Sequence, residues 1–248
     1  QLDKTNVTEI IYPDSDGQPM ADNTLQFRWI VLLKENLDCI FAHNPQVFVA
    51  GDLLWYPVEG HPEIRIAPDV FVVFGRPKGD RGSYRQWQED NIAPQVVFEI
   101  LSPGNTVKEM RKKRQFYEYY GVTEYYLYDP DENDLEIYLR QGEKLVAQEI
   151  TQSWQSPRLT IRFVLTPQTL EVYDLQGQPF LTTIQFNEQM QRERQRANLE
   201  QQRATLEQQR AEQERQRADA EKQRADRLLA QLQALGIPPE VSFGEPSP

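Results

Sequence analysis

The sequence predicts an α/β fold in which helices flank a mixed sheet that shorter hairpins extend. Segments that we expect to form helix, strand, strand, strand, helix and strand follow one another in this order, which is typical of an α/β layer arrangement. Nearly all the aromatic residues of the 248-residue chain precede residue 186, so this part can bury a core of its own. We therefore expect a domain over 1–185, a helical tail rich in Gln, Arg and Glu over 186–237, and a disordered end over 238–248.

The first expected element is an amphipathic helix that Asp22 or Asn23 can cap. Its apolar residues recur at helical spacing, as Leu25, Trp29, Leu32, Leu33, Leu37 and Ile40. A strand over 47–56, bent at Gly51, is expected to follow it.

Two strongly apolar stretches, 65–74 and 95–101, predict buried strands. After the second one, Thr106 and Glu109 have the spacing of a capping box, which starts a helix that Gly121 ends. Further strands are expected over 124–129 and near 134–140, 143–151, 159–164 and 169–174.

The two apolar stretches each contain one acidic residue, Asp69 and Glu99. A buried carboxylate without a partner costs several kcal/mol, on the order of a lost charged hydrogen bond or more. If the strands are neighbours, the two carboxylates repel each other unless a cation lies between them, and oxygen ligands suit Mg²⁺ or Mn²⁺. The backbone carbonyl of Ile100 could supply a third oxygen. Lys113 of the following helix could orient or help deprotonate a water molecule, or offset charge on a phosphate.

For each residue alone, a structural role is the alternative. Asp69 after Pro68 could cap a turn, Glu99 could pair with an arginine, and Lys113 could be one of several solvated charges. The combination of all three favours the hydrolysis of a phosphodiester.

Pro68-Asp69, followed by Glu99 in an apolar strand, resembles the PD-(D/E)xK nuclease superfamily with its restriction-endonuclease-like fold. More closely, a set of spaced residues resembles the Uma family of bacterial putative restriction endonucleases, formerly a domain of unknown function. This set comprises the run 99–106, Lys113, Tyr117, Gly121-Val122, Glu124-Tyr125-Tyr126 and Asp129-Pro130. The resemblance covers about residues 22–175, and it implies that Asp69 and Glu99 bind the metal and that Lys113 assists catalysis.

The lysine departs from the superfamily pattern, in which it stands two residues after the acid. Leu101 occupies that place here, so the resemblance implies that the lysine has moved to Lys113, with Lys112 as a weaker substitute. A further acid from the first helix is common in the superfamily, and Glu35 is a poor match for it.

DNA as the substrate is implied by the resemblance, although the net charge of −11 argues against nonspecific coating of nucleic acid. Local support comes from the basic helix 108–114 and from the long loop 76–91, which we expect to be mobile. The loop carries Arg76, Lys78, Arg81 and Arg85 beside Tyr84 and Trp87. A solvated surface is the alternative for both segments.

Five copies of a seven-residue unit fill 191–225, and each places a Glu three residues before an Arg, which supports a long helix. The Ala and Leu positions lie on opposite sides of this helix, so the pattern leaves open whether it is a solvated stalk or an oligomerising coiled coil. A homo-oligomer could form through this helix or through the domain over 1–185.

The alternative function is a catalytically inactive nuclease fold that serves as an interaction module through this tail. We expect a cytoplasmic protein that has no membrane contact, because no apolar run of about 18 residues and no signal-peptide pattern occurs.

Overall fold

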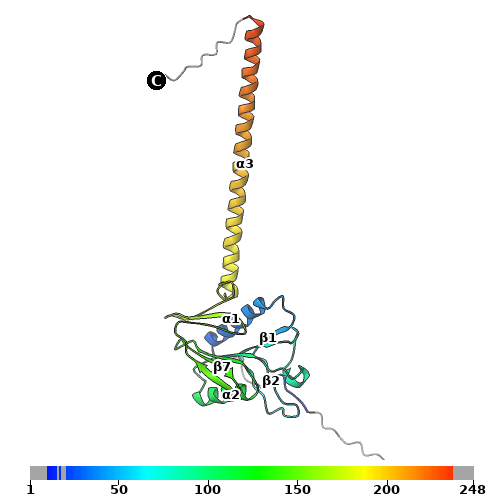
Figure 1. Ribbon diagram of the computed structural model, residues 1–248, viewed down its shortest axis with the longest axis vertical. Helices are drawn as coiled ribbons and strands as arrows, with labels where there is room; N and C mark the ends of the chain where they lie inside the picture. Colours follow the sequence, from blue (N-terminus) through cyan, green and yellow to red (C-terminus); the bar gives the residue numbers. More distant parts are fainter. Residues whose placement is uncertain (1–9, 16, 18–20, 237–248) are drawn as a thin grey trace, which may run out of the picture. The chain divides into compact units, whose positions relative to one another are not determined.

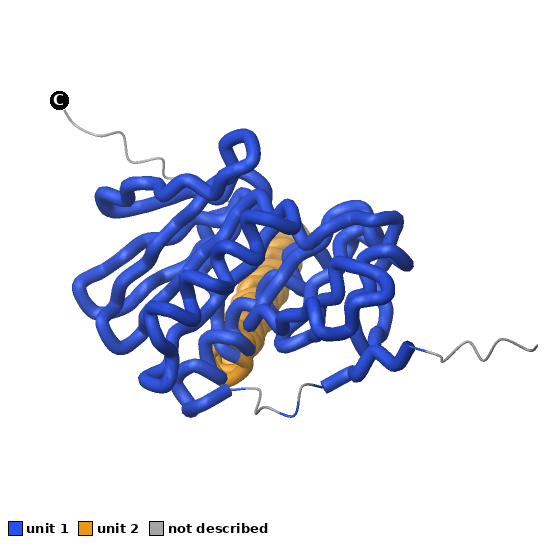
Figure 2. Tube along the Cα trace, turned by 90° about the horizontal axis from the view of Figure 1, so that it is seen from below, with its two compact units in different colours: residues 1–182 blue, residues 183–248 orange. Residues whose placement is uncertain are grey.

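The computed structural model describes residues 10–15, 17 and 21–236 (Figure 1). The chain divides into two compact units, Gln1–Thr182 and Thr183–Pro248, which Figure 2 shows in different colours. The expected disordered end at 238–248 lies outside the described residues.

The first unit is built on a six-stranded sheet with the order β1-β3-β5-β6-β7-β8. Its strands are β1 (Val47–Gly51), β3 (Val70–Phe74), β5 (Val96–Ile100), β6 (Glu124–Asp129), β7 (Asp134–Gln141) and β8 (Lys144–Gln148). β5 and β6 run parallel, and the other neighbours are antiparallel. The predicted mixed α/β sheet is therefore confirmed. The parallel pair requires a crossover, which helix α2 provides.

Helices α1 (Thr24–Ile40) and α2 (Val107–Tyr119) pack on opposite faces of this sheet. Asn23 caps α1 by accepting hydrogen bonds from two backbone amides, and Thr106 caps α2 through the amide of Glu109. Alternate strand residues contact one helix or the other: Val70, Val72, Phe98 and Ile100 share a core with α1, and Phe71, Val73, Val97, Tyr125 and Leu127 share one with α2. The strands are apolar on both faces because both are covered.

Two smaller sheets complete the first unit. One is the parallel pair β2 (Trp55–Tyr56) and β4 (Tyr84–Arg85). The other comprises β9 (Ser153–Gln155), β10 (Arg162–Leu165) and β11 (Leu170–Tyr173) and shares the core on the α1 side. The expectation of one strand over 47–56 was wrong, since the chain leaves β1 at Asp52, where φ is 48°, before β2 begins. β9 was not predicted, because its short polar sequence has no clear alternation.

The loop 76–91 is held by ion pairs, contrary to the mobile segment that its composition suggested. Glu89 accepts hydrogen bonds from Arg76 (2.9 Å) and Arg81 (2.6 Å), and all three side chains are largely buried. The guanidinium of Arg81 also lies 4.0 Å from the ring centre of Phe48. These two arginines are therefore neutralised within the protein, which weakens the case for this loop as a phosphate-binding surface.

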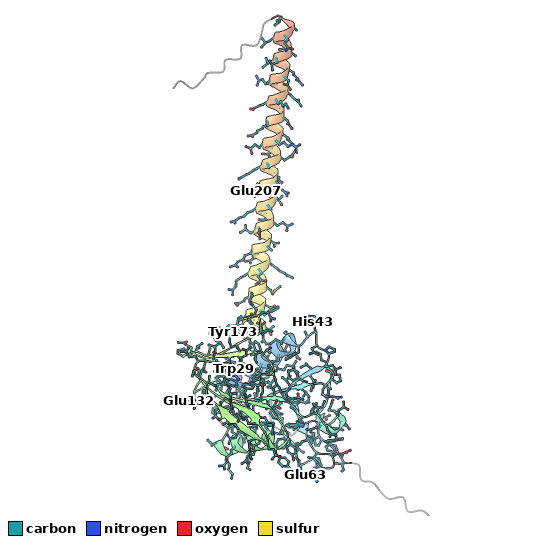
Figure 3. The ribbon with its side chains drawn as sticks, viewed as in Figure 1. Trp29, His43, Glu63, Glu132, Tyr173 and Glu207 are labelled. Carbon is teal, nitrogen blue, oxygen red and sulfur yellow. The ribbon has the colours of Figure 1, made fainter. Side chains whose placement is uncertain are left out.

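The second unit contains α3 (Thr183–Ala234), a 52-residue helix. All its residues are exposed except Leu232, which is half-buried, and Figure 3 shows its side chains projecting outward along its length. Along the described length of α3, one ion pair forms, between Glu188 and Arg192 at i,i+4, whereas the Glu and Arg residues spaced by three are not paired. Within the described part of the chain, no helix combines the length and apolar character needed to cross a membrane.

Candidate metal and catalytic site

Asp69 and Glu99 lie opposite each other at one end of the sheet. The antiparallel register of β3 and β5 pairs Val70 with Phe98, which places Asp69 beside Glu99 on the face that α2 covers. Asp69 was expected inside a strand, but it immediately precedes β3. Because Pro68 cannot donate a backbone hydrogen bond, the ladder ends there and the Asp69 side chain lies at the rim of the sheet.

Asp69 is buried, with 7% of its surface exposed, and its Oδ2 accepts a 2.6 Å hydrogen bond from the backbone amide of Ile100. Burial, followed by the negative charge of Glu99, raises the pKa of Asp69 to about 8, although Lys113 and the Ile100 amide act in the opposite direction. Burial and the neighbouring carboxylate both disfavour the anion, so this carboxyl group keeps its proton near neutral pH unless a cation binds beside it.

Glu99 is 2% exposed and is held by two residues of α2. Lys113 Nζ lies 2.8 Å from Glu99 Oε2, and the hydroxyl of Tyr117 donates to Oε1. Burial and the nearby Glu99 carboxylate raise the pKa of Tyr117 well above its ordinary value, so this hydroxyl keeps its proton and remains a donor. Lys113 and Tyr117 are four residues apart, and one face of α2 therefore presents both to the same carboxylate.

The carbonyl of Ile100 is bonded by a side chain of α1, which covers the other face of the sheet. It accepts a 2.9 Å hydrogen bond from the buried amide Nε2 of Gln26, whose Oε1 accepts from the backbone of Asp22 at 2.8 Å. A strand residue directs its amide and carbonyl to the same side, and the Ile100 amide is bonded to Asp69. The Ile100 oxygen therefore lies on the Asp69 side of β5 and keeps a second lone pair.

Lys113 carries its positive charge in this setting. Burial alone would lower its pKa, but the charges of Glu99 and Asp69 outweigh burial, so the pKa of Lys113 lies above its ordinary value. Lys112 is exposed, and no ion pair joins it to another described residue. Glu35 has a side chain that is 57% exposed and pairs with Lys34, and no contact joins it to Asp69 or Glu99 within the described part of the chain.

The sequence did not single out three further groups around this site. Gln26 orients the Ile100 carbonyl, and Tyr117 was noted only as part of the family pattern. The charge of Asp52 raises the pKa of Asp69, and its backbone amide donates to the Asp69 carbonyl at 3.1 Å. A helical glutamine and a post-strand Gly-Asp pair are common in surface positions, so only the fold reveals them as neighbours of the site.

The donor set suits a hard divalent cation. Two carboxyl groups and a backbone carbonyl all supply oxygen ligands, and a divalent cation would favour the ionised form of Asp69 that burial and Glu99 disfavour. The oxygens of Glu99 that bond to Lys113 and Tyr117 retain lone pairs for a metal. Over the described residues, no group of three or more His, Cys, Asp and Glu side chains has a metal-binding arrangement, so the third protein ligand would have to come from the backbone.

Comparisons with known proteins gave one family model and a solved structure of low similarity. The crystal structure of a putative nuclease from Anabaena variabilis is 16% identical in sequence and gives a TM-score of 0.40, with 56% of this chain and 74% of that chain covered. No curated protein sequence matches the chain. The model of the Uma2 family, described as "Putative restriction endonuclease", matches residues 17–168, which is more than half of the chain. The chain therefore belongs to the Uma2 family.

Proposed function

We propose that this protein is a metal-dependent endonuclease that hydrolyses DNA phosphodiester bonds. The observation that carries this proposal is the placement of Asp69 opposite Glu99 at one end of the sheet, with Lys113 Nζ 2.8 Å from the Glu99 carboxylate. Asp69, Glu99 and Ile100 would hold Mg²⁺ or Mn²⁺, which when bound supplies Lewis-acid activation of a phosphodiester and of the attacking water.

The residues of the chain have separate roles in this proposal. Lys113 would act as a cation that offsets charge on the phosphate, since the carboxylates of Glu99 and Asp69 raise its pKa in the metal-free protein. Tyr117 fixes the orientation of the Glu99 carboxylate, and Gln26 fixes that of the Ile100 carbonyl. The described fold of residues 21–182 would form the nuclease domain, and α3 would be an appended helix.

A nicking assay on supercoiled plasmid with Mg²⁺ or Mn²⁺ tests the function. We expect cleavage by the wild-type protein, loss of at least about 100-fold in Asp69→Asn and Glu99→Gln, and a smaller loss in Lys113→Ala. Lys112→Ala is the matched control, because it removes the adjacent positive charge without touching Glu99. Equal cleavage by wild type, Asp69→Asn and Glu99→Gln would contradict the proposal.

A second candidate is an inactive nuclease fold that serves as an interaction module, and the exposure of α3 along its length favours this reading. Absence of both cleavage and Mn²⁺ binding in the wild-type protein, together with self-association that disappears when α3 is deleted, would favour the module over the enzyme.

A further inference from the structure

Trp55 of β2 contacts both halves of the candidate site. Its backbone exchanges two hydrogen bonds with Ile66, at 2.7 and 3.2 Å, and Ile66 leads through two residues to Asp69. Its ring lies parallel to that of Tyr117, with an interplanar angle of 3° and ring centres 6.5 Å apart. Because the Tyr117 hydroxyl donates to Glu99, Trp55 joins the segment that leads to Asp69 with the helix that holds Glu99.

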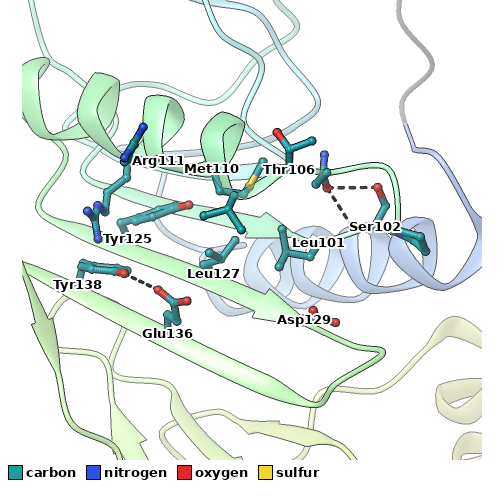
Figure 4. A pocket seen from close by; sticks show the side chains of 14 residues that line it. Leu101, Ser102, Thr106, Met110, Arg111, Tyr125, Leu127, Asp129, Glu136 and Tyr138 are labelled. Carbon is teal, nitrogen blue, oxygen red and sulfur yellow. Dashed lines mark hydrogen bonds between the residues drawn. The ribbon is translucent and has the colours of Figure 1, made fainter.

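Helix α2 rests on this tryptophan with its second half. Phe116 and Tyr120 meet the Trp55 ring edge-on, with ring centres 5.5 and 6.2 Å away and interplanar angles of 90° and 75°. The first half of α2 instead borders a cavity of about 500 Å³ between the helix and strands β6 and β7, which Met110 helps to line (Figure 4). The close packing on Trp55 therefore helps to fix where α2, with its two partners of Glu99, lies over the sheet.

Trp55 is itself held in one orientation. It is 0% exposed, and its Nε1 donates a 3.0 Å hydrogen bond to Oε1 of Gln86. Gln86 begins the short helix η1 (Gln86–Gln88) of the loop 76–91, and its Nε2 donates to the carbonyl of Asn91 at 3.2 Å. A buried indole whose N–H has a partner is fixed in its plane. The position of the ring is therefore tied to the ordered loop on one side and to α2 on the other.

We propose that Trp55 is a positioning residue that sets the spacing between Asp69 and the Glu99 carboxylate, and thereby the affinity of the site for a divalent cation. It acts through Ile66 on one side and through Tyr117 on the other. Groups that orient the ligands of a metal contribute about 10–100-fold to its affinity. A tryptophan that only filled the core would change stability and leave this affinity unchanged. The inference rests on the proposed metal-dependent function for the cation, whereas the spacing of the two carboxyl groups exists without metal.

Titration of full-length variants with Mn²⁺, followed by electron paramagnetic resonance or calorimetry, tests the proposal. Trp55→Phe keeps an aromatic ring in the core but removes the indole N–H and half of the ring system, and it should weaken Mn²⁺ binding about tenfold. Gln86→Leu removes the acceptor of this N–H from a partly exposed position, without a change inside the core, and it should weaken binding in the same direction. In a Tyr117→Phe background, Trp55→Phe should cost less affinity than in the wild type, because one of its two routes to the site is already broken.

Two matched controls separate positioning from packing. Trp154→Phe makes the same exchange at a partly buried tryptophan of the core on the α1 side, and Gln88→Leu makes the same exchange at an exposed position of η1. Both should keep the Mn²⁺ affinity of the wild type, even where Trp154→Phe lowers the unfolding midpoint. Unfolding midpoints show whether each variant is folded, and Gln86→Leu decides the question if Trp55→Phe does not fold.

A measurement in EDTA separates this inference from the proposed function. The backbone amide of Ile100 donates to Asp69, so its NMR signal reports the place of that carboxyl group without metal. This signal should shift in Trp55→Phe and Gln86→Leu and should stay in place in Gln88→Leu.

The outcomes divide as follows between the two proposals. Absence of Mn²⁺ binding by the wild-type protein would overturn the metal-dependent function, and the Ile100 signal would then decide the positioning role by itself. Mn²⁺ binding that neither Trp55→Phe nor Gln86→Leu weakens would overturn the positioning role alone. An equal loss of affinity in Trp154→Phe and Trp55→Phe, or an Ile100 signal that neither Trp55→Phe nor Gln86→Leu moves, would also overturn it.

Discussion

At the scale of single residues, the buried carboxylates were predictable from the sequence, but their relation to each other was not. Asp69 and Glu99 each interrupt an apolar run, and a buried charge requires a partner. The sequence does not show that β3 and β5 pair in the register that brings the two together, because that register depends on contacts between segments about 30 residues apart. Gln26 was missed for the same reason, since its partner Ile100 is distant in the chain.

The raised pKa of Asp69 predicts that the metal-free protein loses stability as the pH rises. The folded state holds the proton up to a pH of about 8, whereas the unfolded chain releases it near 3.8, so folding takes up a proton between these values. The stabilising contribution is complete below pH 3.8 and is lost as the pH passes 8, and its size is on the order of several kcal/mol.

Urea unfolding of the wild-type protein and of Asp69→Asn in EDTA, between pH 5 and 9, measures this effect. Asparagine stays neutral and can still accept from the Ile100 amide, so the free energy of unfolding of the wild type should fall relative to the variant as the pH rises. At pH 8.5, Mg²⁺ should restore stability to the wild type alone. Parallel profiles for the two proteins would show that Asp69 does not carry the raised pKa.

Substitutions of two buried tyrosines test the hydrogen bond between Tyr117 and Glu99, with Tyr125 as the control. Both Tyr117 and Tyr125 are 0% exposed, but only the hydroxyl of Tyr117 bonds to Glu99, whereas that of Tyr125 has no partner within the described part of the chain. Tyr117→Phe should lower the free energy of unfolding by about 1–3 kcal/mol and weaken Mn²⁺ binding, and Tyr125→Phe should change neither or should stabilise slightly. Chemical unfolding and Mn²⁺ titration check both variants. Equal effects of the two substitutions would contradict the role given to Tyr117.

At the scale of elements, helices were predicted more closely than loops. α1 and α2 begin at the expected caps because capping is a local property that the residues themselves encode. The loop 76–91 was misjudged because its arginines were assessed as a group, and the sequence does not show that Glu89 pairs with two of them.

Glu89→Gln should therefore loosen this loop. It removes the carboxylate between Arg76 and Arg81 and leaves the largely buried guanidinium of Arg81 without a charged partner, while Arg76 keeps its ion pair with Asp90. The expected loss in the free energy of unfolding is about 1–3 kcal/mol. Asp90→Asn is the control, because it removes the other ion pair of Arg76, to a side chain that is 78% exposed, and leaves Glu89 in place. Asp90 has a φ of 52°, which asparagine tolerates. Its effect should stay within about 0.5 kcal/mol. Limited proteolysis between 76 and 91 should accelerate in Glu89→Gln only, and equal cleavage rates in the two variants would argue against this pairing.

At the scale of the whole molecule, the division of the chain follows from composition. The aromatic residues that form both cores precede residue 183, and the second unit begins where the Gln-, Arg- and Glu-rich sequence becomes continuous. The sequence predicted the helix from its repeated charge pattern, but the predicted Glu-Arg pairs at a spacing of three do not form over its described length. The helix exposes nearly all its side chains and gains little from packing, so its stability depends on local propensity and on weak side-chain pairs.

This dependence makes α3 the less stable unit and gives a prediction for the whole chain. Residues 183–234 should lose helical structure gradually on heating, at a temperature below the cooperative unfolding of residues 21–182, because a helix without tertiary packing melts noncooperatively. Circular dichroism at 222 nm, compared with near-ultraviolet aromatic signals, separates the two events, since aromatic residues are concentrated in the first unit. A protein that ends at Thr182 should keep the aromatic transition and lose the gradual one. If α3 instead forms a coiled coil with a second copy, the first transition becomes sharp and its midpoint rises with protein concentration. Sedimentation then gives the mass of an oligomer for the full chain and the monomer mass for the protein without α3.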